Sequence, residues 1–110
     1  MQKLKVSLII TTYNWPEALF LVLKSVKNQF TLPDEIIIAD DGSSKETENI
    51  IRKFSKNFKL KIIHSWQEDR GFRAAMSRNK AIAKAENEYI IMTENSLYVV
   101  SASIQTKRIS

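Results

Sequence analysis

The 110-residue chain contains no cysteine, one histidine and two glycines, and the scarcity of each of these residue types excludes a class of function. Without cysteine the chain has neither disulfides nor thiolate chemistry, which agrees with the reducing cytoplasm as the expected location. The single histidine, His64, cannot form a polyhistidine metal site, and we expect it to be an ordinary residue at a strand end. The two glycines form neither a Gly-x-x-x-x-Gly-Lys-Ser/Thr phosphate-binding loop nor a Gly-x-Gly-x-x-Gly dinucleotide motif, so both of these classes of nucleotide-binding protein are excluded.

Long hydrophobic runs are also missing, since no stretch approaches the roughly 20 apolar residues of a membrane span. Residues 1–5 lack the apolar core and the cleavage site of a signal peptide. The net charge of +5 comes from lysines spread along the chain, most of them on the expected polar faces of helices. Attraction to an acidic membrane surface or to an anionic ligand is the alternative. Interleaved aromatic residues are absent, so we expect no nucleic-acid partner, and a basic nucleic-acid-binding domain is the weakest hypothesis.

Apolar periodicity predicts a regular alternation of strands and helices within one domain. Strands are expected at residues 5–13, 35–40, 60–64 and 88–92, with helices between them over 14–30, 43–58 and 71–86. Repeated units of this length require parallel strands with right-handed crossovers. The predicted fold class is therefore α/β, an open and mainly parallel sheet with helices on both faces, in the order β-α-β-α-β-α-β. Residues 98–104 alternate loosely and could add a C-terminal edge strand.

Two helix starts carry the spacing of a capping box. Asn14 precedes Glu17 by three positions, and Ser43 precedes Glu46 by three. Pro16 falls in the first turn of its helix, where a missing N–H costs nothing. We therefore predict that the side chains of Asn14 and Ser43 cap their own helices.

Polar residues gather where the predicted strands end. In open α/β sheets the ligand crevice lies beyond the carboxyl ends of the strands. An aromatic ring there can stack on a nucleobase or can merely pack against a helix. A carboxylate there can accept a hydrogen bond from a base imide or can serve only as a helix cap. The candidate residues at the first two strand ends are Thr11, Thr12, Tyr13, Asn14, Asp40 and Asp41.

Arginines surround the start of the third predicted helix. Arg70, Arg73 and Arg78 could bind a diphosphate, because guanidinium groups match phosphate oxygens and helix N-termini attract anions. The alternative is that some of them pair with the nearby acids Glu68 and Asp69.

Taken in order, four motifs resemble the family 2 glycosyltransferases of the GT-A fold, over roughly residues 4–92. They are Val6–Asn14, Ile38–Ser43, Gly71 with Arg78, Asn79 and Ala81, and Glu88–Ile91. The resemblance implies binding of a nucleotide-diphosphate sugar, UDP-linked before others, for inverting glycosyl transfer in polysaccharide biosynthesis. It also implies that Thr11 and Tyr13 hold the base, that Asp41 reads the base imide, and that Arg73 or Arg78 lies near the base or the diphosphate.

The same resemblance implies a metal site, and here the sequence departs from the family pattern. Family members place an Asp-x-Asp triplet after the fourth strand, where it binds ribose and a Mg²⁺ or Mn²⁺ ion that bridges the diphosphate. This chain has Glu94-Asn95-Ser96 instead, so we expect Glu94 to be the remaining ligand of a weakened site.

The family's acceptor-binding half and catalytic base lie further along the chain than this sequence extends. We therefore expect residues 1–97 to be a truncated GT-A-like nucleotide-sugar-binding domain and residues 98–110 an atypical tail or edge strand. The catalytic residues and the saccharide acceptor stay unassigned, and whether the chain is an enzyme stays open. The alternative function is a non-catalytic nucleotide-binding or self-associating remnant, because exposed sheet edges tend to be covered by homo-oligomer contacts.

Overall fold

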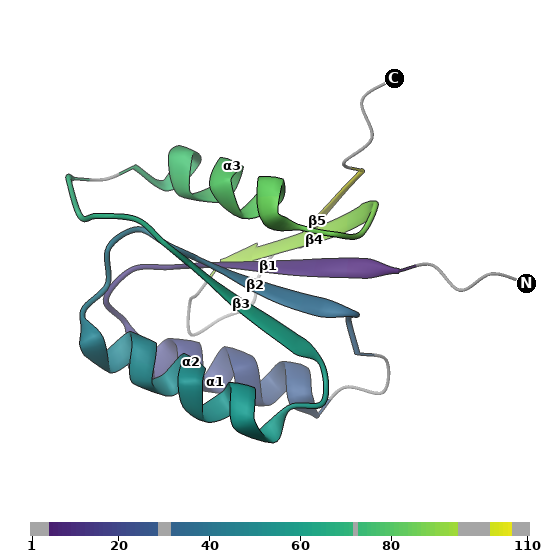
Figure 1. Ribbon diagram of the computed structural model, residues 1–110, viewed down its shortest axis with the longest axis horizontal. Coiled ribbons are helices and arrows are strands. Elements are labelled where there is room, and N and C mark those ends of the chain that lie inside the picture. The colour runs from purple at the N-terminus through teal and green to yellow at the C-terminus, as the bar shows by residue number, and fades with distance from the viewer. Residues whose placement is uncertain (1–4, 29–31, 72, 95–101, 107–110) are drawn as a thin grey trace, which may run out of the picture.

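The computed structural model describes residues 5–28, 32–71, 73–94 and 102–106. Its sheet has the strand order β3-β2-β1-β4-β5, with α1 and α2 on one face and α3 on the other (Figure 1). The strands are β1 (Val6–Thr12), β2 (Glu35–Asp40), β3 (Lys61–Trp66), β4 (Tyr89–Glu94) and β5 (Ala102–Thr106). The helices are α1 (Pro16–Lys27), α2 (Lys45–Asn57) and α3 (Ala74–Lys84).

The predicted α/β class, with four parallel strands, is confirmed. β1 pairs in parallel with β2 and β4, and β2 pairs in parallel with β3, as repeated βα units require. β5 pairs antiparallel with β4 and is an edge strand of the sheet. A C-terminal edge strand was predicted over residues 98–104, of which 98–101 lie outside the described residues. Among the described helices, none combines the length and the apolar character needed to cross a membrane.

The interior strands bury side chains on both faces, which explains their almost continuous apolar sequences. Alternate residues of each strand point to opposite faces, so β1 and β2 contribute to two separate cores. The core beneath α1 and α2 consists of Leu8, Ile10, Leu19, Val22, Leu23, Val26, Ile36, Ile38, Ile51 and Phe54. The core beneath α3 is smaller and built largely from short side chains, namely Ile9, Ile37, Ala39, Ala81, Ala85 and Ile90.

The register of the sheet places the carboxyl ends of the four parallel strands side by side at the same end of the sheet. Asp40 at the end of β2 lies between Thr12 on β1 and Trp66 on β3. On the other side of β1, Thr11 is opposite Glu94, the last residue of β4. The candidate residues from separate strands are therefore neighbours in space.

The two predicted capping boxes are wrong. α1 is capped at Trp15 and α2 at Ser44, and neither helix has a side-chain cap hydrogen bond. Instead, the backbone N–H of Asn14 donates to Ser43 Oγ at 2.8 Å, and the backbone N–H of Ser44 donates to Asn14 Oδ1 at 2.7 Å. The two turns lie side by side because β1 and β2 end in register, so each side chain bonds to the other turn rather than to its own helix.

The third helix also begins later than the sequence predicts. α3 starts at Ala74 instead of Gly71, because Gly71 has a φ of +86°, which a right-handed helix does not allow. Residues 67–71, which follow β3, form a strap that passes over the turn following β2. Gly42 in that turn has a φ of +96°, and a Cβ placed on it would lie 2.5 Å from the Cα of Asp69 in the strap.

We predict that Gly42→Ala destabilises the protein more than Gly71→Ala does. Both residues have positive φ, which costs a non-glycine residue roughly 1–2 kcal/mol. Only at Gly42 does the added methyl group also meet backbone, since nothing lies within 4 Å of the same position at Gly71. Urea unfolding of the two variants measures the difference, and an equal loss at both positions would contradict the close approach of the strap.

Candidate functional site

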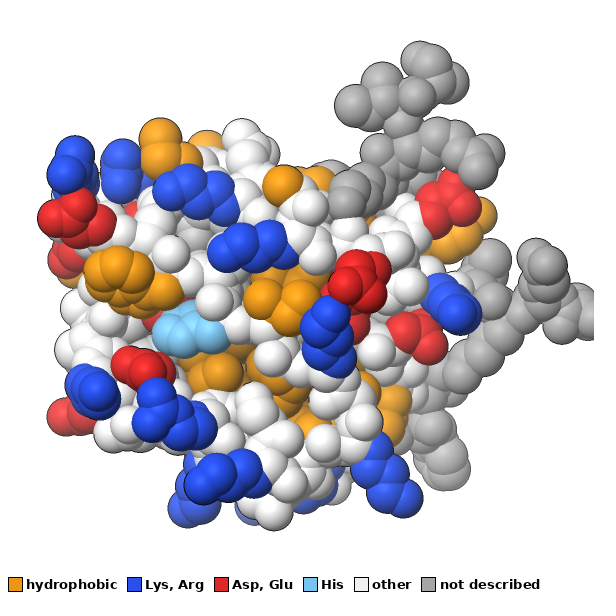
Figure 2. Space-filling model, viewed as in Figure 1, with side chains coloured by type: hydrophobic (Ala, Val, Ile, Leu, Met, Phe, Trp, Pro, Cys, Tyr) orange, Lys and Arg blue, Asp and Glu red, His pale blue; other side chains and the backbone are white. Residues whose placement is uncertain are grey.

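The carboxylate of Asp40 is completely buried at the carboxyl end of β2. Its Oδ1 accepts the backbone N–H of Ser43 at 2.9 Å, and its Oδ2 lies 2.8 Å from His64 Nε2. A buried carboxylate is costly unless charged or hydrogen-bonding groups compensate it, and both oxygens have such a partner here. The side chain of His64 is 20% exposed, so the pair reaches the surface, where the histidine is visible in Figure 2.

This pair shows what the sequence reading of His64 missed. His64 lies beside Ile38 in the register of β2 and β3, so its side chain points to the same face as that of Asp40, two residues on. The available signal was a histidine directly after the apolar residues Ile62 and Ile63, together with another predicted strand that ends in an acid. Sequence alone does not state that these strands are neighbours.

Ser43 extends the contacts of Asp40 to two other turns. Its Oγ accepts the N–H of Asn14, and its carbonyl oxygen accepts the indole N–H of Trp66 at 3.1 Å. Asn14 has a φ of +42°, a left-handed conformation that asparagine tolerates better than most residues. The backbone next to Tyr13 is thus held in an unusual conformation by a serine that Asp40 itself positions.

Asp41 points to the opposite face, toward the start of α3, and is only 5% exposed. Its Oδ1 accepts Gln67 Nε2 at 2.6 Å, and its Oδ2 accepts the backbone N–H of Arg73 at 2.7 Å. Gln67 also donates to the carbonyl oxygen of Arg73 at 3.2 Å, which ties the strap to the helix start. A carboxylate has about four lone-pair sites, so Asp41 keeps capacity for another donor.

Some buried polar atoms lie on residues that are linked to Asp41 and have no hydrogen-bond partner. Among the described residues the buried side-chain atoms without a partner are Glu35 Oε1, Thr47 Oγ1, Gln67 Oε1, Arg73 Nε, Ser77 Oγ and Thr93 Oγ1. Gln67 and Arg73 hydrogen-bond to Asp41, and the backbone N–H of Ser77 donates to the carbonyl oxygen of Arg73. Because buried polar atoms are nearly always hydrogen-bonded, a polar ligand or water is a candidate partner for the atoms on these three residues.

Tyr13 lies at the outer edge of this cluster with an exposed ring. The side chain is 49% exposed, and its hydroxyl donates to Asp69 Oδ2 at 2.8 Å. The hydrogen bond from the tyrosine, followed by the negative charge of Asp69, raises the pKa of Tyr13 above its ordinary value. One edge of the ring is therefore held by the strap while its faces stay available for stacking.

The remaining candidates on β1 flank these groups. Thr11 is partly buried at the point where β1 faces the end of β4, and Thr12 is buried. The carbonyl oxygen of Thr12 accepts the backbone N–H of Asp41 at 3.2 Å. Thr11, in register with Ala39, therefore points to the face of Asp41, whereas the side chain of Thr12, in register with Asp40, points to the opposite face.

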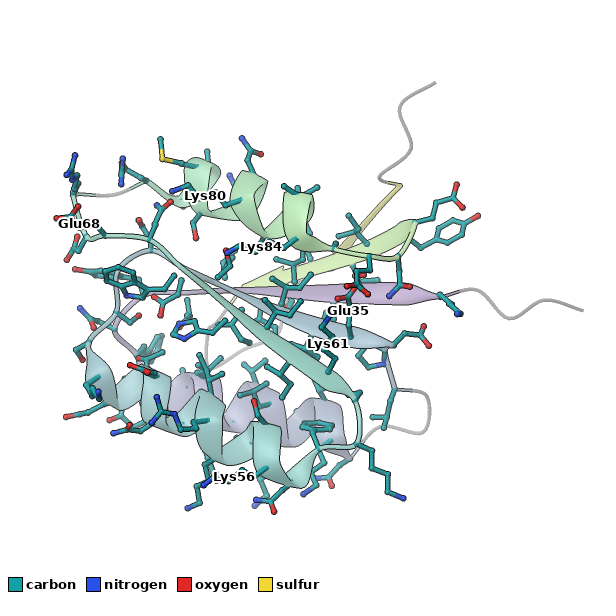
Figure 3. The ribbon with its side chains drawn as sticks, viewed as in Figure 1. Glu35, Lys56, Lys61, Glu68, Lys80 and Lys84 are labelled. Atoms are coloured by element: carbon teal, nitrogen blue, oxygen red, sulfur yellow. The ribbon has the colours of Figure 1, made fainter. Side chains whose placement is uncertain are left out.

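The three arginines near α3 have different surroundings. Arg70 forms an exposed ion pair with Glu68 at 2.9 Å, in the strap where Figure 3 labels that glutamate. Arg73 is half-buried and donates through Nη2 to the carbonyl oxygen of Glu68 at 3.3 Å. Arg78 is exposed on α3 and forms no ion pair within the described part of the chain. Pairing with a surface acid was the predicted alternative, and it holds for Arg70.

The residues that the structure describes do not include a complete metal site. No group of three His, Asp or Glu side chains that could hold a metal ion gathers within these ranges. The predicted ligand Glu94 ends β4 opposite Thr11, and Asn95 and Ser96 lie outside the described residues. The metal site therefore stays a prediction.

We predict that His64→Leu destabilises the protein strongly. The substitution removes the partner of Asp40 Oδ2 and leaves a fully buried carboxylate half-paired, which costs about 3 kcal/mol. Lys61→Gln is the matched control on the same strand, because the ion pair of Lys61 with Glu86 is exposed at the other end of β3. Urea unfolding should show a large loss for the first variant and a midpoint near wild type for the second. Equal midpoints would show that the Asp40–His64 pair contributes nothing.

Comparison with known proteins agrees with this geometry. The model of the family described as "Glycosyl transferase family 2" matches residues 7–95. The hyaluronan synthase of Pasteurella multocida is 37% identical over 106 residues, which are 91% of this chain and 11% of that protein. The cholesterol galactosyltransferase of Borreliella burgdorferi is 33% identical over 105 residues, 96% of this chain and 28% of that protein. The chain thus spans about a tenth to a quarter of the length of these relatives.

Solved structures share the fold. Residues 1–349 of S. aureus TarS, in complex with UDP-GlcNAc, superpose with a TM-score of 0.72 at 28% identity, covering 84% of this chain and 26% of that one. The mannosyltransferase PcManGT of Pyrobaculum calidifontis, in complex with GDP-Man and Mn²⁺, gives a TM-score of 0.71 at 24% identity, covering 83% of this chain and 27% of that one. The family model matches most of this chain, and the chain has the GT-A arrangement of strands and helices. The chain therefore belongs to glycosyltransferase family 2.

Proposed function

We propose that the polar groups at the end of β2, in the strap and at the start of α3 bind the nucleoside diphosphate of a nucleotide sugar, as the donor-binding part of a glycosyl transfer enzyme. The observation that carries the proposal is the buried carboxylate of Asp41, which keeps acceptor capacity and binds Gln67 and Arg73, two residues that each have a further buried polar atom without a partner. The exposed ring of Tyr13 is tied to the same strap through Asp69. A planar ligand with a polar edge satisfies both features at once, by stacking and by hydrogen bonding.

The donors and acceptors around Asp41 favour a base with an imide group. Asp41 can accept an N–H, and Arg73 Nε beside it can donate to a carbonyl oxygen. Uracil offers an N–H flanked by carbonyls, whereas cytosine has no proton on the corresponding ring nitrogen. UDP is therefore the preferred ligand, with GDP next, since guanine also has a ring N–H beside a carbonyl. TarS was solved with UDP-GlcNAc and PcManGT with GDP-Man.

In this proposal the carboxylates of Asp40 and Asp41 have different tasks. Both oxygens of Asp40 already have protein partners, so Asp40 acts by positioning Ser43 and Asn14 rather than by touching the ligand. Asp41 reads the base. Thr11 and Tyr13 lie beside the base on the face of Asp41, and Thr12 contributes through its backbone carbonyl oxygen, which holds the N–H of Asp41.

The diphosphate lies on the side of the site nearest α3 in this proposal. Arg73 and Arg78 supply positive charge there, and the N-terminus of α3 adds its own attraction for anions. Glu94 is the proposed ligand of a weakly held Mg²⁺ or Mn²⁺, because Asn95 and Ser96 offer no second carboxylate in its immediate neighbourhood. When bound, such an ion would stabilise negative charge on the leaving diphosphate.

A second function is a non-catalytic nucleotide-binding domain. It is favoured by the lack of a three-carboxylate or histidine group in the described ranges that could hold a metal. Calorimetric titration with UDP, GDP and CDP, each with and without Mn²⁺, separates the two. Binding that strengthens with Mn²⁺, together with transfer or hydrolysis of a donor sugar, supports the transferase; metal-independent binding without turnover supports the second function.

We predict that Asp41→Asn weakens UDP binding about 10- to 100-fold, the value of one hydrogen bond to a charged group. The amide keeps the size of the side chain but replaces one acceptor oxygen with a donor. Glu86→Gln removes the same charge from an exposed position at the opposite end of the sheet and should leave the affinity unchanged. Calorimetry on folded protein, checked by circular dichroism, measures both. An affinity that survives Asp41→Asn would mean that Asp41 only holds the strap.

A further inference from the structure

The outward face of α1 and α2 carries one sequence pattern twice. Each helix has a glutamate, two residues at the third and fourth positions after it, and a lysine at the seventh, which is the spacing of a single helix face. On α1 these residues are Glu17, Phe20, Leu21 and Lys24, and on α2 they are Glu46, Asn49, Ile50 and Lys53.

The central residues of the two patterns line a shared groove. The groove has a volume of about 530 Å³ and is lined by Pro16, Glu17, Phe20, Leu21, Glu46, Asn49 and Ile50. Phe20 and Leu21 are 39% and 51% exposed, although Phe20 also packs edge-on against Phe54 of α2, with ring centroids 5.5 Å apart. Large apolar side chains are therefore presented to solvent between two helices that already have a complete core beneath them.

The charges at the two ends of the groove have opposite signs. α1 and α2 run in the same direction, because both connect parallel strands across one face of the sheet (Figure 1). Glu17 and Glu46 therefore lie together at the N-terminal end, and Lys24 and Lys53 lie together two turns further on. Within the described residues none of these four side chains forms an ion pair.

Helix dipoles alone favour acids in first turns and bases in last turns, but they do not account for the whole pattern. They give no reason for an exposed phenylalanine and leucine between the charges. α3 has no acid in its first turn, so the arrangement is not a general property of helices in this chain.

We propose that a second copy of this chain docks on the groove, with the two copies related by a two-fold axis that lies in the interface and runs perpendicular to α1 and α2. An axis in this direction makes the facing helices antiparallel, so the glutamates of each copy face the lysines of the other. The apolar residues meet at the centre and the charges form the rim, the usual composition of a protein interface. A surface that is complementary to itself is what an isologous dimer requires.

Paired charge reversals test this dimer. An acidic variant carries Lys24→Glu and Lys53→Glu, and a basic variant carries Glu17→Lys and Glu46→Lys. Each variant alone should associate at least about tenfold more weakly than wild type in sedimentation equilibrium, because like charges now face each other. An equimolar mixture of the two should recover dimers, since every facing pair is again opposite in sign.

The control variant carries Lys80→Glu and Lys84→Glu on α3, across the sheet from the groove (Figure 3). It has the same change in net charge as the acidic variant and should dimerise like wild type. Equal weakening in this control, or unchanged dimers in both reversed variants, would overturn the proposal. A wild-type protein that stays monomeric up to about 1 mM, the range of very weak association, would also overturn it.

A second measurement does not depend on how the variants fold. Wild-type chains labelled with ¹⁴N and ¹⁵N are mixed in equal amounts and treated with a carbodiimide, which joins carboxylates to amines in contact. Mixed-isotope peptides that link Lys24 to Glu17 or Glu46 of another chain support the proposed contact. Crosslinks between chains that consistently involve other residues would contradict it.

Discussion

The buried carboxylate of Asp40 is the constraint on which the candidate site depends. A negative charge with no exposure to water must be compensated within the protein, and here the compensation comes from His64 on β3 and from the turn after β2. Ser43, which Asp40 holds, accepts two further hydrogen bonds, one from the backbone N–H of Asn14 and one from the indole N–H of Trp66. Three strand ends are thus held together by one charge, and the position of the Tyr13 ring depends on it.

The sequence was sufficient to predict most of the fold, because the signals for strands and helices are local. Interior strands such as Glu35–Asp40 are almost wholly apolar, and α1 has its apolar residues at helical spacing. The failures concern bonds between distant segments. Asn14 and Ser43 are 29 residues apart, so a local pattern suggested helix caps where the folded chain makes contacts between turns.

The positions of the candidate site residues in the fold could be predicted, whereas their tasks stay predictions. Tyr13, Asp40, Asp41 and Arg73 were placed at strand ends or at the start of a helix, and the structure joins Asp41 to Arg73 while Asp40 faces His64 on the other side of the sheet. The contribution of Gln67 was not predicted, since a glutamine in a strap has no recognisable pattern. Its relation to Asp41 depends on the path of the strap over Gly42, which only the folded backbone reveals.

Asp40 and Asp41 are adjacent at the end of β2, so their side chains point to opposite faces of the sheet. The two carboxylates therefore have different surroundings and different proposed tasks. Asp40 faces the large core beneath α1 and α2, where a charge must be fully paired. Asp41 faces α3, whose small side chains, such as Ala81 and Ala85, let the helix lie close to the sheet. This closeness brings the N–H of Arg73 to within 2.7 Å of Asp41, and Arg73 keeps a buried Nε without a partner. The groove between α1 and α2 lies on the other face, so a dimer formed there leaves the surroundings of Asp41 open. The proposed nucleotide site and the proposed dimer interface thus lie on opposite faces of one sheet, so loss of one leaves the other intact.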